Sequence, residues 1–277
     1  MAMGPSPLGC GKRLSTSRAA KCSMQACICG ARRGVRDLFD IMWQRHTCRT
    51  AYNPAMAIRE EDLWRILDAA RWAPTAHNFQ NFEIVVIDDQ QRLSAISAIR
   101  MSPAESFMRE SYSPLSMSDA ESLDKRTGLL ASMLPESWHE LEAVEDGAGS
   151  RPHTIVGGTI PPCPALLIVV YDIRLGTATP EAASETLMSL GCVMQNMWLM
   201  TESLGISMQV LSGLGAPAAE ARVRRILHIP QYLKIAFAAR LGYPIDDSGS
   251  YLRVRRKIQE FTHHNRYGAR DFPVVQA

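Results

Sequence analysis

The residues best suited to bind a ligand lie in one short stretch, where a helical pattern is followed by an apolar strand. Thr75 offers a hydroxyl group there, and Asn78 and Gln80 offer carboxamides. Pro74 ends the helix just before them, since proline cannot continue a helical hydrogen-bond pattern. These side chains donate and accept hydrogen bonds without carrying charge. A loop of this kind between two rigid elements suits a planar polar ligand better than a metal or a phosphate.

Two basic patches lie far from this loop in the sequence. In the first, Arg45-His46-Thr47-Cys48-Arg49, two guanidinium groups flank a hydroxyl. Arginine gives planar, bidentate donors to phosphate, and threonine adds a short donor. The second patch lies in the tail and contains Arg253, Arg255 and Arg256. Taken alone, each patch is more typical of a solvated basic surface.

Together, the loop and the basic patches suit flavin mononucleotide (FMN). This cofactor needs cationic donors for its phosphate and neutral hydrogen-bonding groups for the edge of its ring. Ser212 and Gly213 follow an expected strand, and glycine leaves a bare backbone N–H for a close approach to the redox nitrogen. For Asn78, a turn or capping role after Pro74 is an equal alternative.

No group of His, Cys, Asp and Glu has the spacing of a metal site, so no metal is expected. Cys22, Cys27 and Cys29 are crowded but lack the C-x₂-C spacing of zinc sites. We interpret the seven cysteines as free thiols of a reducing compartment. The adjacent His263 and His264 point in different directions on any regular element, which disfavours a shared metal.

The bulk composition excludes several classes of partner. The chain has 277 residues, 46% of them hydrophobic, and a net charge of +2. These values give no case for nucleic acid, and no apolar run approaches the ~20 residues of a membrane span. Residues 1–35 contain no acidic residue and are interpreted as a disordered or dispensable extension. A cytoplasmic location is expected, with organelle targeting by the basic N-terminus as the lesser alternative.

Hydrophobic spacing predicts helices over 36–46, 59–71, 181–204 and 218–227, and strands over 82–88, 165–171, 206–211 and 234–241. The helix over 181–204 is apolar around most of its surface, so it belongs in a protein centre or a subunit interface. Residues 100–160 are irregular and too long for a passive connection, which predicts an inserted lid. The alternation of helices and strands indicates an α/β-type chain with one compact domain over 36–270.

The chain resembles the FMN-dependent nitroreductase family, over about residues 37–270. Arg45-x-Thr47-x-Arg49 is similar to the family's basic-hydroxyl-basic motif, and Leu211-Ser212-Gly213 to its glycine-bearing strand end. The family motif Ala-Pro-Ser-x-x-Asn-x-Gln-Pro-Trp resembles residues 73–82, and its basic tail resembles residues 255–268. The chain departs from the family pattern at Ala76, Asn81, Phe82 and Ser212.

The resemblance implies an α+β sandwich with the nitroreductase-like fold: a central mixed, mainly antiparallel sheet flanked by helices. It also implies a domain-swapped homodimer with each flavin at the interface. The implied cofactor-binding residues are Arg45, His46, Thr47, Arg49, Pro74, Thr75, Ala76, Asn78, Gln80, Ser212, Gly213, Arg253, Arg255 and Arg256. Residues proposed to meet the substrate are His77, Phe107, Tyr112 and Trp138.

The implied activity is that of an FMN-dependent oxidoreductase. It would pass hydride from NADH or NADPH through flavin N5 to a small organic acceptor, such as a nitroaromatic or a quinone, by a ping-pong mechanism. Two alternatives stay open. One is a relative that consumes reduced flavin or dehalogenates an aromatic ring reductively, and the other is a non-catalytic FMN-binding protein.

Overall fold

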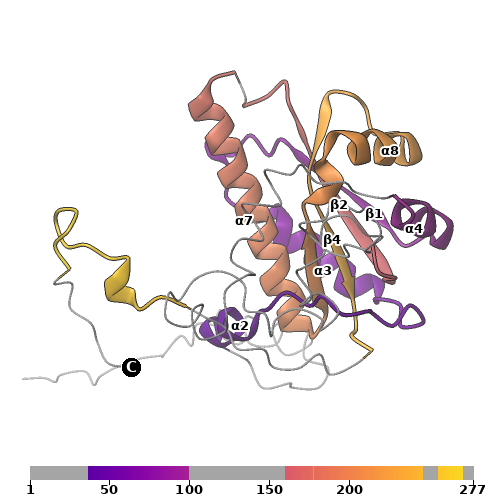
Figure 1. The fold of residues 1–277 in the computed structure, drawn as a ribbon, viewed down its shortest axis with the longest axis horizontal. Helices are drawn as coiled ribbons and strands as arrows, with labels where there is room; N and C mark the ends of the chain where they lie inside the picture. The colour runs from indigo at the N-terminus through magenta and orange to yellow at the C-terminus, as the bar shows by residue number, and fades with distance from the viewer. Residues whose placement is uncertain (1–36, 100–159, 177, 246–254, 271–277) are drawn as a thin grey trace, which may run out of the picture.

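The computed structural model describes residues 37–99, 160–176, 178–245 and 255–270. In these residues a four-stranded antiparallel sheet lies between two layers of helices (Figure 1). Its order is β1-β2-β4-β3, and the strands are β1 (Phe82–Ile87), β2 (Ala165–Asp172), β3 (Ser207–Leu211) and β4 (Leu233–Gly242). The helices are α2 (Leu38–Gln44), α3 (Glu60–Arg71), α4 (Gln90–Ser97), α7 (Pro180–Leu204) and α8 (Pro217–Leu227). The expected extension, 1–35, and nearly all of the expected lid lie outside the described residues.

The central strand β2 shows why the sheet is covered on both sides. Leu166, Ile168 and Val170 point into one apolar core, which α4 and α8 cover. Leu167 and Val169 alternate with them and point into a second core, beneath α3 and α7. Successive side chains of a strand point to opposite faces, so the continuous apolar run of β2 fills both cores.

The four predicted strands are confirmed, with no end shifted by more than one residue. The sequence pattern missed helix α4, because only Leu93 and Ile96 of its eight residues are buried. The helix begins at a standard cap, in which the Asp89 carboxylate accepts a hydrogen bond from the Arg92 N–H at 2.9 Å. The Asp88-Asp89 pair therefore ends β1 and also begins a helix.

Helix α7 is the longest of the described elements and runs along one face of the sheet (Figure 1). Thr179 caps it by accepting from the Ala182 N–H at 3.2 Å, and Pro180 takes its first position. Gly205 ends it in the left-handed conformation, with φ 72°. The apolar residues of α7 lie on two sides of the helix. Those on its inner side pack on the sheet and on α3, while Leu187 and Met188 on its outer side are 63% exposed.

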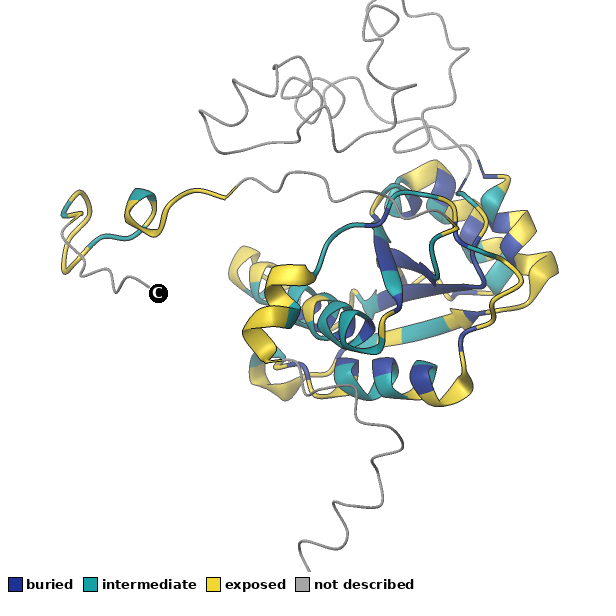
Figure 2. Ribbon diagram, turned by 90° about the horizontal axis from the view of Figure 1, so that it is seen from below, coloured by how far each residue is buried: buried dark blue, intermediate teal, exposed yellow. Residues whose placement is uncertain are grey.

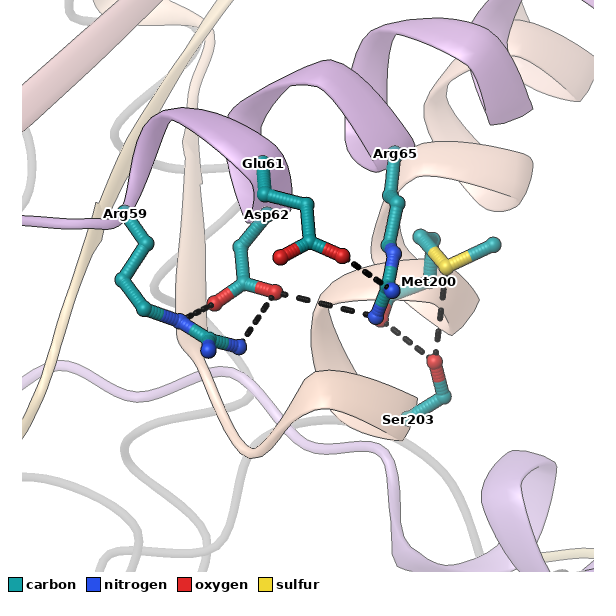
Figure 3. A network of polar contacts seen from close by, with 6 residues as sticks. All are labelled: Arg59, Glu61, Asp62, Arg65, Met200 and Ser203. Atoms are coloured by element: carbon teal, nitrogen blue, oxygen red, sulfur yellow. Dashed lines mark hydrogen bonds and ion pairs between the residues drawn. The ribbon is translucent and has the colours of Figure 1, made fainter. Parts of the chain in front are cut away.

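Helix α3 packs against α7 and begins with an ion pair between an exposed Arg59 and a buried Asp62 (Figure 3). The Asp62 carboxylate accepts from Arg59 Nε at 2.8 Å and from Arg59 Nη2 at 3.0 Å, although Asp62 is only 2% exposed. A carboxylate in the first turn also interacts favourably with the helix dipole. Arg65 pairs with Glu61 on the exposed side of the same turns. These contacts fix the helix that leads into the polar loop.

Two glycines give a paired test of how tightly this fold is packed. A Cβ on Gly242 would lie 2.7 Å from Tyr52 Cβ and 2.8 Å from Pro164 Cδ, whereas a Cβ on Gly191 would meet nothing within 4 Å. We predict that Gly242→Ala lowers the free energy of unfolding by about 1–3 kcal/mol through overpacking. Gly191→Ala should raise it by up to about 1 kcal/mol, because alanine favours helix. Urea unfolding measures both, and equal effects would contradict the packing described at Gly242.

Candidate active site

The polar loop before β1 is held in a strained backbone conformation. Its first part is a single 3₁₀ turn, Ala76–Asn78. Three of its residues lie in the left-handed region without being glycine: His77 with φ 51°, Asn78 with φ 56° and Gln80 with φ 46°. Such conformations each cost of the order of 1 kcal/mol or more, and they persist where surrounding contacts enforce them. They concentrate at functional sites.

The contacts that hold this loop come from α7 and from the loop itself. The Ala76 N–H donates to Ser189 Oγ at 2.9 Å, and Ser189 Oγ in turn donates to a carbonyl of its own helix. Within the loop, the Gln80 N–H donates to Thr75 Oγ1 at 3.2 Å, and Gln80 Nε2 donates to Asn78 Oδ1 at 3.0 Å. The loop therefore presents a small, ordered array of hydroxyl and amide groups.

Asn81, which follows the loop directly, ties it to the turn after β2. Asn81 is buried, and its Nδ2 donates to the carbonyl oxygen of Leu175 at 3.2 Å. The next turn is tied to α7 in the same way, because Thr186 Oγ1 donates to the Gly176 carbonyl oxygen at 2.6 Å. The loop, the turn after β2 and the first turns of α7 thus form one connected unit. Neither Asn81 nor Ser189 was identified from the sequence as part of the site, since their role depends on contacts distant in the chain.

An open depression of about 390 Å³ lies beside the loop and is lined by Arg71, Trp72, Ala73, Asn78 and Gln80. Its volume is in the range of small-molecule sites. Trp72 is 73% exposed, which is unusual for so large an apolar side chain. An aromatic residue directly before Ala73-Pro74 was the sequence signal that could have placed Trp72 in the site. His77 is also exposed, with Nε2 3.5 Å from Glu185 Oε2.

The first basic patch lies elsewhere, on the edge strand β3. The Arg45 guanidinium stacks 4.3 Å from the ring centre of Trp198 on α7, and the Cys48 N–H donates to the Met208 carbonyl oxygen at 3.4 Å. Further along, Tyr52 lies in the core on the opposite face of the sheet. The segment 45–52 therefore crosses the edge of the sheet at β3. His46, Thr47 and Arg49 are half-buried along it.

Beneath this segment lies a buried cluster around Arg240 of β4, which is fully buried. Arg240 Nε donates to Gln209 Oε1 at 2.5 Å, and its guanidinium carbon lies 4.1 Å from the ring centre of Tyr52. Burial lowers the pKa of Arg240 and raises the pKa of Tyr52. Burial also raises the pKa of the nearby Cys163 thiol to about 11, so this cysteine stays protonated near neutral pH. The sequence pattern predicts only that Arg240 lies in a strand.

The structure brings the predicted residues together as two groups, and it keeps the two groups apart. Arg45, Thr47 and Arg49 lie along β3, whose end carries Ser212 and Gly213. The residues from Pro74 to Gln80 precede β1, on the opposite edge of the sheet. Three inter-strand steps separate these edges, or about 14 Å. Along α7, nine residues separate the Ser189 contact from the Trp198 contact, again about 14 Å.

The remaining predicted residues contribute less to this picture. Arg255 and Arg256 are exposed, and Arg256 stacks 5.6 Å from the Phe261 ring within the tail. Figures 1 and 2 both place residues 255–270 apart from the sheet and its helices. Arg253 and the proposed substrate residues Phe107, Tyr112 and Trp138 lie outside the described residues. Among the described residues no group of side chains could hold a metal ion, and no described helix combines the length and apolar character needed to span a membrane.

The antiparallel sheet between helices, together with this polar loop, defines an α+β fold shared with solved oxidoreductase structures. A nitroreductase family protein from Clostridium difficile 630 is 17% identical, with a TM-score of 0.52 over 84% of this chain and 99% of that one. An FMN-dependent nitroreductase from Clostridium difficile R20291 is 14% identical, with a TM-score of 0.51 over 83% and 99%. A candidate NADH dehydrogenase/NAD(P)H nitroreductase from Parabacteroides distasonis is 14% identical, with a TM-score of 0.52 over 84% and 99%.

The sequence itself identifies the family. The model of the nitroreductase family matches residues 42–243, which is most of the chain and includes both groups of site residues except the tail. The protein therefore belongs to the nitroreductase family and is an oxidoreductase. No curated protein sequence matched the chain.

The hydrogen bond from Ala76 to Ser189 gives a test of how the loop is held. Ser189→Ala removes that bond, and we predict a loss of about 1–2 kcal/mol in the stability of the loop, because the Ala76 N–H loses its partner. Ser184→Ala is the matched control, since Ser184 Oγ also donates to a carbonyl four residues back on α7, at 2.9 Å, but does not contact the loop. Hydrogen exchange of the Ala76 amide reports the effect. Equal exchange rates in the two variants would show that Ser189 does not anchor the loop.

Proposed function

We propose that this protein is an FMN-dependent oxidoreductase that uses NADH or NADPH to reduce a small organic acceptor. The observation that carries the proposal is the loop from Thr75 to Gln80, held with three non-glycine residues in the left-handed conformation. Strain of this kind is maintained where a ligand requires a fixed array of groups. Membership of the nitroreductase family and the described likeness to an FMN-dependent nitroreductase support FMN as that ligand.

The residues present fit the chemistry of FMN. The segment with Arg45, Thr47 and Arg49 offers two guanidinium groups and a hydroxyl for the phosphate. Thr75, Asn78 and Gln80 offer uncharged donors and acceptors for the pyrimidine edge of the ring. The proposed contacts also include the sequence neighbours of these residues, Pro74, Ala76 and His46. Further proposed phosphate contacts come from the tail, at Arg253, Arg255 and Arg256.

We infer that one flavin site is built from two copies of the chain. Ser212 and Gly213 are proposed to approach N5, while Asn78 is proposed to contact the pyrimidine edge directly beside N5. Within one chain these groups follow opposite edges of the sheet, about 14 Å apart. Groups that contact one ring edge must lie within a few ångströms of each other, so the loop of one chain would complete the site on β3 of its partner.

Exposed apolar side chains support this homodimer. Helix α2 exposes Leu38, Phe39, Met42 and Trp43, and helix α7 exposes Leu187 and Met188, each by at least 47%. Covering these side chains with a second copy removes apolar area from water. The tail over 255–270, which lies apart from the rest of its own chain, would pack on the partner in a domain-swapped arrangement (Figure 2).

A bound flavin would supply the redox chemistry, namely ping-pong transfer of hydride from NADH or NADPH through N5 to a nitroaromatic, a quinone or a similar acceptor. The protein would bind the flavin, orient it and shield it from solvent. Backbone N–H groups at Ser212-Gly213 and the Asn78 amide would stabilise negative charge that develops on the ring. His77, paired with Glu185, is the exposed side chain of the loop best placed to meet an acceptor. In the proposed organisation, the domain over 36–270 contains the inserted lid over 100–160, and the extension over 1–35 precedes it. The proposed location is the cytoplasm.

The visible spectrum of the purified protein tests this function. Bound FMN gives a yellow protein, and anaerobic NADH or NADPH should bleach it, with colour returning on addition of a nitroaromatic or a quinone. Breakdown of the flavin in air, without anaerobic oxidation of NAD(P)H by a nitroaromatic, would favour a flavin-consuming relative. Bound FMN that neither nucleotide reduces would indicate a non-catalytic carrier, and a protein that stays colourless with added FMN would contradict the proposal.

Arg45→Ala tests the phosphate end of the site. We predict that FMN affinity falls by about 1.5–3 kcal/mol, or roughly 10- to 100-fold, because a charge-assisted contact to the phosphate is lost. Fluorescence titration with FMN measures the change. Arg92→Ala is the control: it removes one exposed arginine, paired with Asp89 on α4, and should leave the affinity unchanged. Equal affinities in all three proteins would show that Arg45 is only a surface residue.

A further inference from the structure

Arg240 carries a buried positive charge, and none of the proposed cofactor contacts involves it. Its side chain is fully buried, and its Nη1 has no hydrogen-bond partner among the residues that the structure describes. The titratable groups that act on its charge are Tyr52, Cys163 and Cys48, and none of them is a carboxylate. A buried guanidinium without a carboxylate is costly, because the interior solvates the charge poorly. Its retention in the middle of a sheet therefore calls for a compensating role.

The hydrogen bonds of Arg240 point to that role. Nη2 donates to the carbonyl oxygen of Cys48 at 3.4 Å and also to the carbonyl oxygen of Thr50. The Tyr52 hydroxyl donates to the same Cys48 oxygen at 3.1 Å. These two carbonyl groups flank Arg49, and the first of them belongs to the residue directly after Thr47. Arg240 thus holds, from below, the segment that carries the predicted phosphate contacts.

The orientation of these carbonyls also orients the backbone on the other side of the segment. No cis peptide bond occurs among the described residues, so each C=O points opposite to the N–H of the next residue. With the Cys48 oxygen turned inward to Arg240, the Arg49 N–H is turned away from the core. A fixed carbonyl on one side therefore fixes a donor on the outer side, where a phosphate would lie.

Arg240 also connects this segment to the end of the site that would hold the ring. Its Nε donates to Gln209 Oε1, and Gln209 lies opposite Arg240 in the pairing of β3 with β4. Three residues after Gln209 comes Ser212, the start of the predicted approach to N5. One guanidinium thereby sets the position of the phosphate segment relative to the strand that ends at Ser212.

We propose that Arg240 is a positioning residue for the phosphate end of the cofactor, acting through the carbonyl groups of Cys48 and Thr50. The proposal rests on the proposed function, in which the segment 45–49 binds the FMN phosphate. Arg240 itself does not touch the cofactor; it keeps Thr47, Arg49 and the Arg49 N–H in register with Ser212-Gly213. Preorganised binding groups of this kind lose affinity steeply when they shift by about 1 Å.

The test compares the binding of FMN with that of riboflavin, which has the same ring but no phosphate. Arg240→Met keeps the volume of the side chain and removes its donors. We expect it to weaken FMN binding by roughly 10- to 100-fold and to leave riboflavin binding within about twofold. A variant that merely loosened the fold would weaken both ligands equally. Arg224→Met is the matched control, because Arg224 also donates to backbone carbonyls, of Pro230 and Leu233, but on α8. Its FMN-to-riboflavin ratio should equal that of the unaltered protein.

A double variant tests whether Arg240 acts through the segment. In an Arg49→Ala background, where a phosphate contact is already lost, Arg240→Met should cost much less FMN affinity than it does alone, because coupled residues are non-additive. Should Arg240→Met fail to fold, Tyr52→Phe decides, since it removes only the hydroxyl that shares the Cys48 oxygen; we expect a two- to fivefold fall in the FMN-to-riboflavin ratio.

The possible outcomes separate this inference from the function on which it rests. An unaltered protein that binds neither FMN nor riboflavin would overturn the proposed function. An unaltered protein that prefers FMN, with the same preference in Arg240→Met, or in Tyr52→Phe if the first variant does not fold, would overturn only the role of Arg240. Fully additive losses in the double variant would also overturn it, since Arg240 would then act independently of Arg49.

Discussion

The structure depends most on helix α7 as a rigid spacer. Its inner side covers one face of the sheet, and its two halves hold different parts of the site: Ser189 anchors the polar loop, and Trp198 stacks on Arg45. A continuous helix has a fixed rise per residue, so the separation between these contacts is set by the helix itself. Neither part of the site can approach the other within one chain unless α7 breaks. This separation is the reason for the proposal that a second copy of the chain completes the site.

Each half of the site is held by a different physical device. The loop is strained, and its left-handed residues are kept in place by hydrogen bonds to α7 and by the buried amide of Asn81. The basic segment is relaxed but crosses the sheet edge, where carbonyl groups turned into the core are met by Arg240 and Tyr52. Both devices place binding groups in advance of the ligand, which lowers the cost of ordering them on binding. The flavin would then meet surfaces that need little rearrangement.

Much of this architecture could be predicted from residue patterns, because the elements that form the core carry strong ones. The apolar run of β2 and the long helix with Pro180 at its start and Gly205 at its end are examples. Helix α4 was missed, since two buried side chains in eight residues give a weak signal. Arg45, Thr75 and Asn78 could be proposed as site residues from the sequence because their motifs are local. Ser189, Asn81 and Arg240 were not, because their meaning comes from partners about 90 to 190 residues away in the chain.

The most direct test of a site shared between two chains is a mixing experiment. One variant carries Arg45→Ala and Arg49→Ala, and the other carries Thr75→Ala and Asn78→Ala, so that each loses a different half of the site. Co-expression with two different affinity tags allows the mixed dimer to be isolated, and its FMN content is then measured by titration. A mixed dimer should regain one tight FMN site with the affinity of the unaltered protein, because one of its two sites combines intact halves. A mixed dimer with only the weak affinities of its parents would show that each site belongs to a single chain, and would contradict the account.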